Sequence, residues 1–377
     1  MRRIDHLLEH QSLGRQTQVS SLHFGVSGEH PKVYIQASLH AEELPGMLVA
    51  YHLRARLEAL EQQGQLRGEV VLVPVANPIG LAQRLDHKAM GRFELSSSEN
   101  FNRNYPDLAA AVCDAVQGQL GIDPQGNVVA VRAAVAEHLA QWKPTTALHS
   151  LRKTLVALAF DADIVLDLHC DCEAVLHLYT ETPCWPQLEP LARLLGARAV
   201  LLAQNAGGVS FDECFSGLWW KLAQRLRADP SRNAYPLLQA CVSATVELRG
   251  EAQLEHALAR ADADAILGFL RHAGALAGEP PPLPAPCCEA TPLAGAQTVK
   301  APVAGMLVFA AQPGDQLHIG DPVVEIIDPI ANTVLIVRSE VDGVLYARTD
   351  DRYSLPGDEL ANIAGSVPFR TGDLLGA

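Results

Sequence analysis

The stretch that decides the fold is KVYIQASLHAEELPGMLVAYHLRARLEA, residues 32–59. Its apolar first part, Lys32 to Ser38, predicts a β-strand, and its last part predicts a helix that begins near Pro45 and runs past Ala59. Proline suits a helix start because the N–H that it lacks would have no partner there. A buried strand that leads into a helix through a short turn is typical of an α/β fold.

The same alternation continues through the first two thirds of the chain. Further apolar runs predict strands at Glu69–Val75, Ile164–Leu168, Ala199–Leu202 and Val242–Leu248. These runs are nearly continuous, as in strands whose two faces are both covered by helices. Helical patterns lie between them, at Val128–Trp142, Leu188–Leu195 and Ala252–Arg271. We therefore expect an α/β domain over residues 1–278, with a mixed central sheet flanked by helices.

The character of the sequence changes after this domain. The segment EPPPLPAP, residues 279–286, can continue neither a helix nor a central strand, so it predicts a stiff linker over residues 279–290. Short apolar runs separated by Gly, Asp and Pro follow the linker. They predict a second, smaller all-β, barrel-like domain over residues 291–377, which is long enough to fold independently.

Composition and charge exclude several classes of protein. The 377 residues are 48% hydrophobic and 19% charged, which is ordinary for a folded chain. The formal net charge is −14 without a block of Lys or Arg, so we expect no nucleic-acid partner. No run of about 18 apolar residues predicts a membrane span, and the N-terminus lacks an apolar stretch of signal-peptide length. Eight cysteines without zinc-finger spacing indicate reduced thiols and a cytoplasmic protein.

Two histidines and a glutamate stand where predicted strands end. His40 and Glu43 lie three residues apart in the turn before the Pro45 helix. His169 follows the run Ile164–Leu168, so parallel strands would bring it to the same edge of the sheet. An isolated histidine is more often a structural core residue, and the HxxE spacing alone is weak. Together, however, two imidazoles and one carboxylate leave a tetrahedral position open, as in a catalytic zinc site.

Glu247 is the only carboxylate inside the predicted strand Val242–Leu248. A buried carboxylate is costly unless it is paired, protonated or bound to a water at a metal site. It is therefore a candidate general base, which takes a proton from water and later delivers it to a leaving nitrogen. The alternative is a buried ion pair with Arg249 or another cation. Residues two apart share a strand face without meeting head to head, which weakens the pairing with Arg249.

The polar segment GRFELSSSENFNRNYPD, residues 91–107, reads as an irregular loop between the two halves of the site. Loops of this kind often carry specificity residues on a rigid scaffold. Asn102 and Arg103 could grip a substrate carboxylate, because a guanidinium binds carboxylates bidentately. A second arginine, Arg92, could stabilise the oxyanion formed when water attacks a carbonyl. The alternative for this loop is a solvated turn.

In combination and order, these motifs resemble the succinylglutamate desuccinylase/aspartoacylase family of zinc carboxypeptidase-like hydrolases, over about residues 20–275. The resemblance implies one Zn²⁺ per chain and the following roles: His40, Glu43 and His169 as ligands, Glu247 as base, Asn102 and Arg103 as carboxylate binders, Arg92 at the oxyanion. Three features depart from the family pattern. The turn at residues 40–43 reads His-Ala-Glu-Glu. Arg249 follows Glu247 closely, so it could reach the pocket and alter the choice of substrate. Residues 106–160 predict a long helical insertion.

The last domain resembles a lipoyl/biotinyl-like β barrel, through its APVAG turn and its PGDQLHIGDPV hairpin. Carriers of that fold present a modifiable lysine at a hairpin tip, but the corresponding tip, Asp328 to Asn332, contains none. We therefore expect a lid, a spacer or an oligomerisation element rather than a carrier. Both this domain and the helical insertion are candidate contacts in a homo-oligomer.

The leading functional prediction is a zinc-dependent hydrolase that cleaves the amide bond of an N-acyl amino acid or a related small metabolite. A zinc carboxypeptidase that acts on a peptide C-terminus is the nearest alternative, because it uses the same metal chemistry. A catalytically silent binding module on the same fold is a third reading. The carboxylate of Glu247 argues against it, since a binding site has no need of a base.

Overall fold

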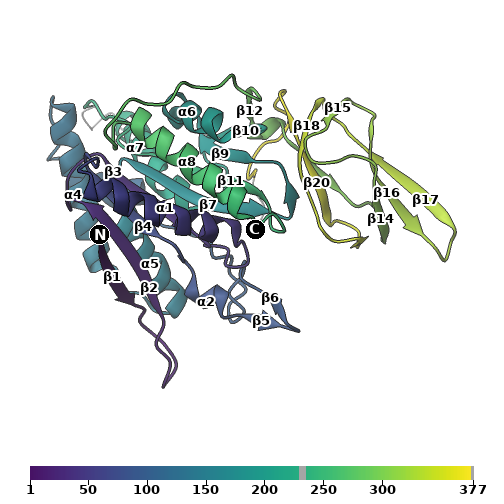
Figure 1. Ribbon diagram of the computed structural model, residues 1–377, viewed down its shortest axis with the longest axis horizontal. Helices are drawn as coiled ribbons and strands as arrows, with labels where there is room; N and C mark the ends of the chain where they lie inside the picture. The colour runs from purple at the N-terminus through teal and green to yellow at the C-terminus, as the bar shows by residue number, and fades with distance from the viewer. Residues whose placement is uncertain (229–234, 375–377) are drawn as a thin grey trace.

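The computed structural model describes residues 1–228 and 235–374. Figure 1 shows a helix-flanked sheet that occupies most of the chain and an all-β part at the opposite end of the molecule. The mixed α/β prediction and the second all-β unit are both confirmed. Among the described residues, no helix has the length and apolar character needed to cross a lipid bilayer.

The central sheet has nine strands in the order β1-β2-β4-β3-β7-β11-β9-β10-β12. Their bounds are β1 Arg2–Leu7, β2 Gln18–Gly25, β3 Lys32–Ala37, β4 Glu69–Val73, β7 Ile164–Asp171, β9 His177–Glu181, β10 Ala199–Ala203, β11 Val242–Gly250 and β12 Ala290–Pro292. The strands β4, β3, β7 and β11 run parallel at the centre. Antiparallel pairs join β1 to β2, β2 to β4, and β9 to β11, so the sheet is mixed.

Helices cover both faces of this sheet, which explains why its central strands are apolar throughout. On β3, Val33 and Ile35 pack into one hydrophobic cluster and Tyr34 into the other. The first face carries α1 Pro45–Gln62, α6 Trp185–Leu195 and α8 His256–His272. The second carries α3 Leu108–Val116, α4 Pro124–Gln141, α5 Ala147–Ala159 and α7 Phe211–Ala228. The predicted helical insertion is therefore the group α3 to α5, which builds most of the second layer.

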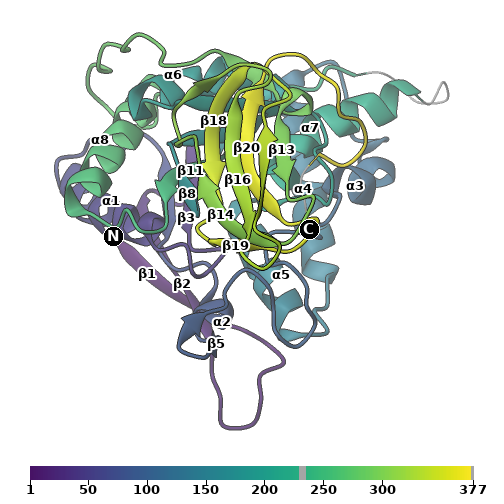
Figure 2. The same ribbon diagram turned by 90° about the vertical axis from the view of Figure 1, so that its right-hand side faces the viewer.

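The all-β part consists of two facing sheets around a small core that includes Val324 and Leu345. Its strands are β13 Gln297–Lys300, β14 Gly305–Phe309, β15 Gln316–Leu317, β16 Pro322–Asp328, β17 Thr333–Arg338, β18 Gly343–Arg348, β19 Tyr353–Ser354 and β20 Glu359–Gly365. Viewed along the long axis, these strands stand in front of the central sheet (Figure 2). The short pair β5 Arg84–Leu85 and β6 Lys88–Ala89 follows α2 Pro78–Leu81 on the rim.

Several contacts fasten the two parts together. The strand β8, Glu173–Ala174, leaves the central sheet directly after β7 and pairs with β18. Glu173 also forms ion pairs with Arg348, at 2.6 Å, and with Arg352. The proline-rich segment is itself held against the helices, since Arg193 on α6 donates to the carbonyl of Pro284 at 2.7 Å. The junction is therefore a packed interface.

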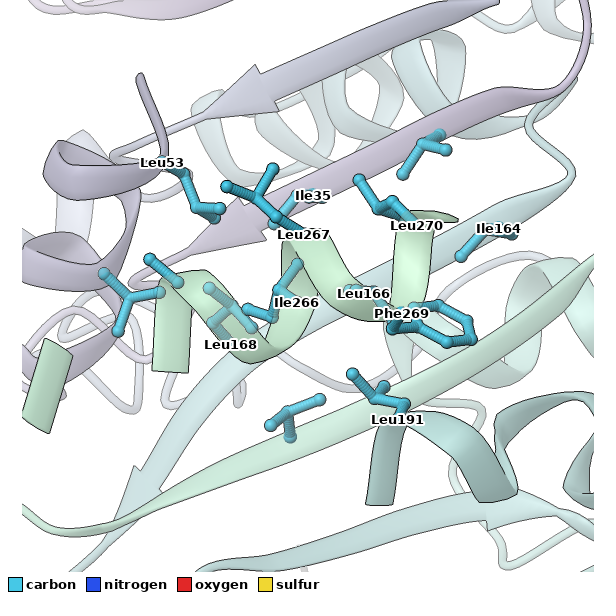
Figure 3. Close-up of a cluster of buried hydrophobic side chains, with 14 of the residues drawn as sticks. Ile35, Leu53, Ile164, Leu166, Leu168, Leu191, Ile266, Leu267, Phe269 and Leu270 are labelled. Carbon is cyan, nitrogen blue, oxygen red and sulfur yellow. The ribbon is translucent and has the colours of Figure 1, made fainter. Parts of the chain in front are cut away.

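The core on the first face of the sheet is made of large hydrophobic side chains from α1, α6, α8 and the central strands (Figure 3). Leu53 on α1 lies against this cluster with none of its surface exposed. We expect Leu53→Ala to lower the free energy of unfolding by about 2–5 kcal/mol, because it leaves a cavity that the neighbours fill only in part. Leu13→Ala, at a fully exposed position, is the matched control and should change it by less than about 0.5 kcal/mol. Chemical denaturation measures both, and equal effects would contradict this packing.

Candidate metal and active site

The pairing of β3 with β7 brings the predicted ligands together. Ala37 at the end of β3 lies opposite Leu168 on β7, so the turn after β3 stands beside His169. The ligand atoms of His40, Glu43 and His169 all lie within 4.8 Å of one another. All three side chains are buried at this edge of the sheet. The cluster lies at the carboxyl ends of parallel strands, where α/β folds bind ligands.

The Glu43 carboxylate lies between the two imidazoles. Its Oε1 is 2.9 Å from Nδ1 of His40, and its Oε2 is 2.7 Å from Nδ1 of His169. The two rings stand edge to face, with centroids 5.0 Å apart. Both Nδ1 atoms and the carboxylate therefore converge on one small volume, which fits the donor set of a divalent cation such as zinc.

The Nε2 atom of each ring lies beside a second polar side chain. Nε2 of His40 donates to Oδ1 of Asn100 at 2.9 Å, and Nε2 of His169 lies 3.0 Å from Oδ2 of Asp167. Asp167 is fully buried and accepts a hydrogen bond from Gln36 at 3.0 Å. Partners of this kind fix the tautomer and the orientation of a metal-binding imidazole. Nδ1 of each ring lies at the Glu43 carboxylate and is the atom that could hold a metal ion.

Charge at the cluster favours a bound cation. Burial, with help from Arg92, lowers the pKa of His40 to about 4, so this ring is neutral and can ligate a metal. Burial alone would raise the pKa of Glu43, but the two adjacent imidazoles outweigh it and hold that pKa well below its usual range. Burial likewise opposes protonation of His169, yet the carboxylates of Asp167 and Glu43 raise its pKa. The two carboxylates that raise the pKa of His169 would also favour a cation beside this ring.

Glu247 lies beside the cluster on the neighbouring strand. It pairs in register with His169 across the parallel ladder of β11 and β7. Its Oε2 is buried and has no hydrogen-bond partner among residues 1–228 and 235–374. Burial and the nearby Glu43 carboxylate raise the pKa of Glu247 well above its usual value. A carboxylate in this setting is suited to accept and hold a proton.

The expectation that Arg249 reaches the pocket is corrected by the structure. Its guanidinium makes a bidentate pair with Asp262 on α8, at 2.7 and 2.9 Å. The register of β11 shifts between Glu247 and Gly250, and Arg249 takes a left-handed backbone conformation with φ of 69°. These irregularities direct the side chain of Arg249 away from that of Glu247. Arg249 therefore fastens α8 to the sheet edge, away from the residues that line the cavity.

The loop over residues 91–107 supplies the other predicted residues. Nη1 of Arg92 lies 2.9 Å from Nδ1 of His40 and 3.2 Å from Oε1 of Glu43, at the mouth of the site. Asn102 is buried and accepts a hydrogen bond from the backbone N–H of Phe211, at the start of α7. Arg103 follows it and lines the cavity. The loop thus brings all three predicted side chains to the edge where His40, Glu43 and His169 lie.

Arg152 on α5 holds this loop in place, a function that its sequence position alone did not reveal. It is buried, and it donates to Glu99 at 2.9 Å and to the backbone carbonyl of Asn100 at 3.0 Å. Because Asn100 in turn accepts from His40, the helical insertion supports the orientation of a predicted metal ligand.

A cavity of about 310 Å³ opens above the cluster and includes Arg92, Asn102, Arg103 and Glu247 in its lining. Its opposite wall comes from the all-β part and from the chain that follows it: Thr298, Tyr346, Asn362, Arg370 and Leu374. Tyr179 of β9 donates to the hydroxyl of Tyr346 at 3.3 Å, across the junction. The all-β part thus borders the cavity. Of the three roles expected for it, which were a lid, a spacer and an oligomerisation element, this position agrees with a lid.

Comparison with known proteins agrees with this geometry. A model of the succinylglutamate desuccinylase/aspartoacylase catalytic domain matches residues 29–273. The chain belongs to this family. No curated protein matches the chain.

Solved structures of this family extend the likeness over nearly the whole chain. A putative family protein from Shewanella amazonensis is 28% identical, with a TM-score of 0.83 over 97% of this chain and 98% of the other. A second, from Shewanella frigidimarina, is 26% identical, with a TM-score of 0.81 over 97% of both chains. The product-bound ectoine utilization protein EutE from Ruegeria pomeroyi shares the fold at 14% identity, with a TM-score of 0.67 over 96% and 95%. The likeness to these three structures therefore includes the all-β part.

The ion pair of Arg249 predicts a stability effect. We expect Arg249→Met to lower the free energy of unfolding by about 3 kcal/mol, because it leaves the buried Asp262 carboxylate without its partner. The double variant Arg249→Met/Asp262→Leu should recover most of that loss, since it removes the uncompensated charge as well. Chemical denaturation measures the free energy of unfolding of both variants. A double variant no more stable than the single one would argue against the pair.

The Asp167 carboxylate, 3.0 Å from Nε2 of His169, predicts a metal-binding effect. We expect Asp167→Asn to weaken Zn²⁺ binding by about 10- to 100-fold, because the amide holds the ring less firmly and lowers the basicity of Nδ1. Competition with a chelator of known affinity measures the change. Asp264→Asn, at a surface position that pairs with Arg56, is the matched control and should bind Zn²⁺ like the wild type. If Asp167→Asn and Asp264→Asn bound Zn²⁺ with equal affinity, Asp167 would have no role in metal binding.

Proposed function

We propose that this protein is a zinc-dependent hydrolase that cleaves the amide bond of an N-acyl amino acid or a related small metabolite. The observation that carries the proposal is the convergence of His40, Glu43 and His169 beside Glu247, whose Oε2 has no hydrogen-bond partner within residues 1–228 and 235–374. Membership of a family named for deacylases supports the same reaction class.

His40 and His169 through Nδ1, and Glu43 through its carboxylate, would hold the ion. A catalytic zinc site has three protein ligands of these types and a fourth position for water or substrate. When bound, zinc supplies Lewis-acid polarisation of the substrate carbonyl and lowers the pKa of water.

Glu247 moves the proton in this scheme. Its raised pKa allows Oε2 to accept a proton from the attacking water and to retain it in the surrounding low dielectric. The same oxygen then delivers the proton to the leaving nitrogen, so the product amine departs without an unstable negative charge. Its position in register with His169 keeps the carboxylate on the neighbouring strand, beside the proposed ligands.

The loop residues orient the substrate. Arg92, at the cavity mouth, would place its guanidinium against the oxygen that gains negative charge in the transition state. Arg103 would bind the carboxylate of the amino acid part. Asn102 uses its carbonyl oxygen to accept from Phe211, so its amide N–H₂ is the group left to face the substrate.

A carboxypeptidase is the main alternative. A cavity of about 310 Å³, walled on one side by the all-β part, fits a small metabolite better than an extended peptide. Release of free amine from N-acyl amino acids, compared with cleavage of dipeptides, separates the two reactions. Preferential cleavage of dipeptides would favour the carboxypeptidase.

The proposed base gives the sharpest test of the enzyme. We expect Glu247→Gln to keep Zn²⁺ and substrate binding while kcat falls by about 10²- to 10⁴-fold, because the amide cannot accept the proton. Single-turnover amine release measures the chemistry, and chelator competition measures the bound zinc. Glu58→Gln on the exposed face of α1 is the matched control. A Glu247→Gln variant that hydrolyses like the wild type would exclude Glu247 as the base.

A further inference from the structure

The all-β part carries an exposed apolar surface that the proposed active site does not use. Its four-stranded sheet has the order β17-β16-β14-β19, and Leu307 and Ile326 on one side of it fill the small core. The cavity wall comes from the other sheet, through Tyr346 of β18 and Asn362 of β20. In Figure 1, β14, β16 and β17 lie farther from the central sheet than β18 and β20 do. The side of the four-stranded sheet opposite its core therefore faces away from the cavity.

Strand register places six apolar side chains on this side in two adjacent rows, and we call them, with the one carboxylate among them, the outer face. Read across the strands, the first row is Tyr353, Met306, Ile327 and Val334, and the second is Val308, Glu325 and Ile336. Val334 is 57% and Tyr353 59% exposed, and of the six apolar side chains only Ile327 is half-buried. A contiguous apolar patch of several hundred Å² on a protein surface marks an interaction site.

The strand β17 forms the edge of this sheet and lacks the usual protection of an edge. It pairs with β16 alone among residues 1–228 and 235–374. Its first five residues, TVLIV, contain no charge and no proline, and its register with β16 shifts only beyond Val337. Exposed edge strands of natural proteins are normally blunted by charges, proline or a bulge. An apolar edge beside an apolar face fits a surface that a partner covers.

A second copy of this chain fits the outer face because the charges on it are self-complementary. Arg338 follows Ile336 by two positions on β17, so it lies on the same side of the sheet as Glu325. Its Nη1 donates to the carbonyl of Gly320 at 2.9 Å, and the guanidinium has further N–H groups for a carboxylate. If two copies pack face to face about a twofold axis between these positions, Glu325 of each copy meets Arg338 of the other.

The area of the outer face is sufficient for a weak dimer. The exposed surface of its two rows amounts to about 500 Å² in each copy, and specific interfaces bury about 1,000 Å² or more in total. An interface at this lower limit gives a dissociation constant in the micromolar range.

We propose that the outer face joins two copies of this chain into a symmetric dimer. The two outer sheets pack against each other, so the apolar rows of both copies are covered and the charges are paired. The central sheets lie at opposite ends of the particle, and both cavities stay open. This assembly goes beyond the proposed hydrolase and does not depend on it.

A concentration series on the full-length protein tests for the dimer. We expect sedimentation velocity to give the mass of one chain at low concentration and twice that mass at high concentration. Val334→Lys should raise the dissociation constant by about 100-fold or more, because it buries a charge without a partner. Leu13→Lys, at a fully exposed position between β1 and β2, is the matched control and should leave it unchanged. A chain that stays monomeric throughout, or equal effects of the two variants, would overturn the proposal.

An exchange of charges tests the twofold arrangement. Glu325→Arg brings like charges together at each contact, so we expect the dissociation constant to rise by about 10-fold or more. The double variant Glu325→Arg/Arg338→Glu restores an opposite pair and should recover most of that loss. A double variant that dimerises no better than Glu325→Arg would overturn the proposed pairing.

Small-angle X-ray scattering tests the shape of the dimer without any variant. Because the outer face lies toward one end of the molecule (Figure 1), the dimer should be elongated, with a maximum dimension close to twice that of one chain. A compact dimer would overturn the proposed interface, even where Val334→Lys does not fold. None of these measurements involves hydrolysis, so failure of the dimer leaves the proposed function intact, and failure of that function leaves the dimer intact.

Discussion

The site depends on the parallel pairing of β3 with β7. This pairing places the turn that carries His40 and Glu43 against the strand that carries His169. The next strand, β11, continues the same ladder and sets Glu247 opposite His169. A slip of one residue between these strands would turn the side chains toward opposite faces of the sheet. The hydrophobic layers on both faces, built from alternate residues of each strand, keep the register fixed.

The sequence was informative where chemistry and strand ends coincide. Charged or imidazole groups directly after apolar runs have few structural uses, so the convergence of His40, Glu43 and His169 could be predicted before any coordinates. The roles of these residues and of Glu247 stay predictions. Asp167 could have been found by the same reasoning, because a carboxylate inside IVLDL needs a buried partner. Asn100 could not, since its role follows from the path of a loop that α5 holds through Arg152.

The errors and gaps come from long-range geometry. Arg249 lies two residues beyond Glu247, but the irregular register of β11 and an acidic partner on α8 direct it away from the cavity. The place of Asp212 and Glu213 in the cavity lining likewise depends on the packing of α7 against the sheet. The cavity wall from the all-β part has no local signal at all, because Tyr346 meets Tyr179 across 167 positions of sequence. Local sequence patterns predict where helices and strands form, whereas contacts of this kind depend on how the helices and strands pack together.

The short strand β8 has a mechanical consequence. It begins four residues after His169, and it is paired with β18 and tied through Glu173 to Arg348. A swing of the all-β part that widened the cavity would therefore pull on the strand that carries His169. One continuous segment of backbone thus links the opening of the cavity to the position of His169. A rigid junction between the two parts keeps the proposed metal ligands aligned, whereas a mobile junction would displace them.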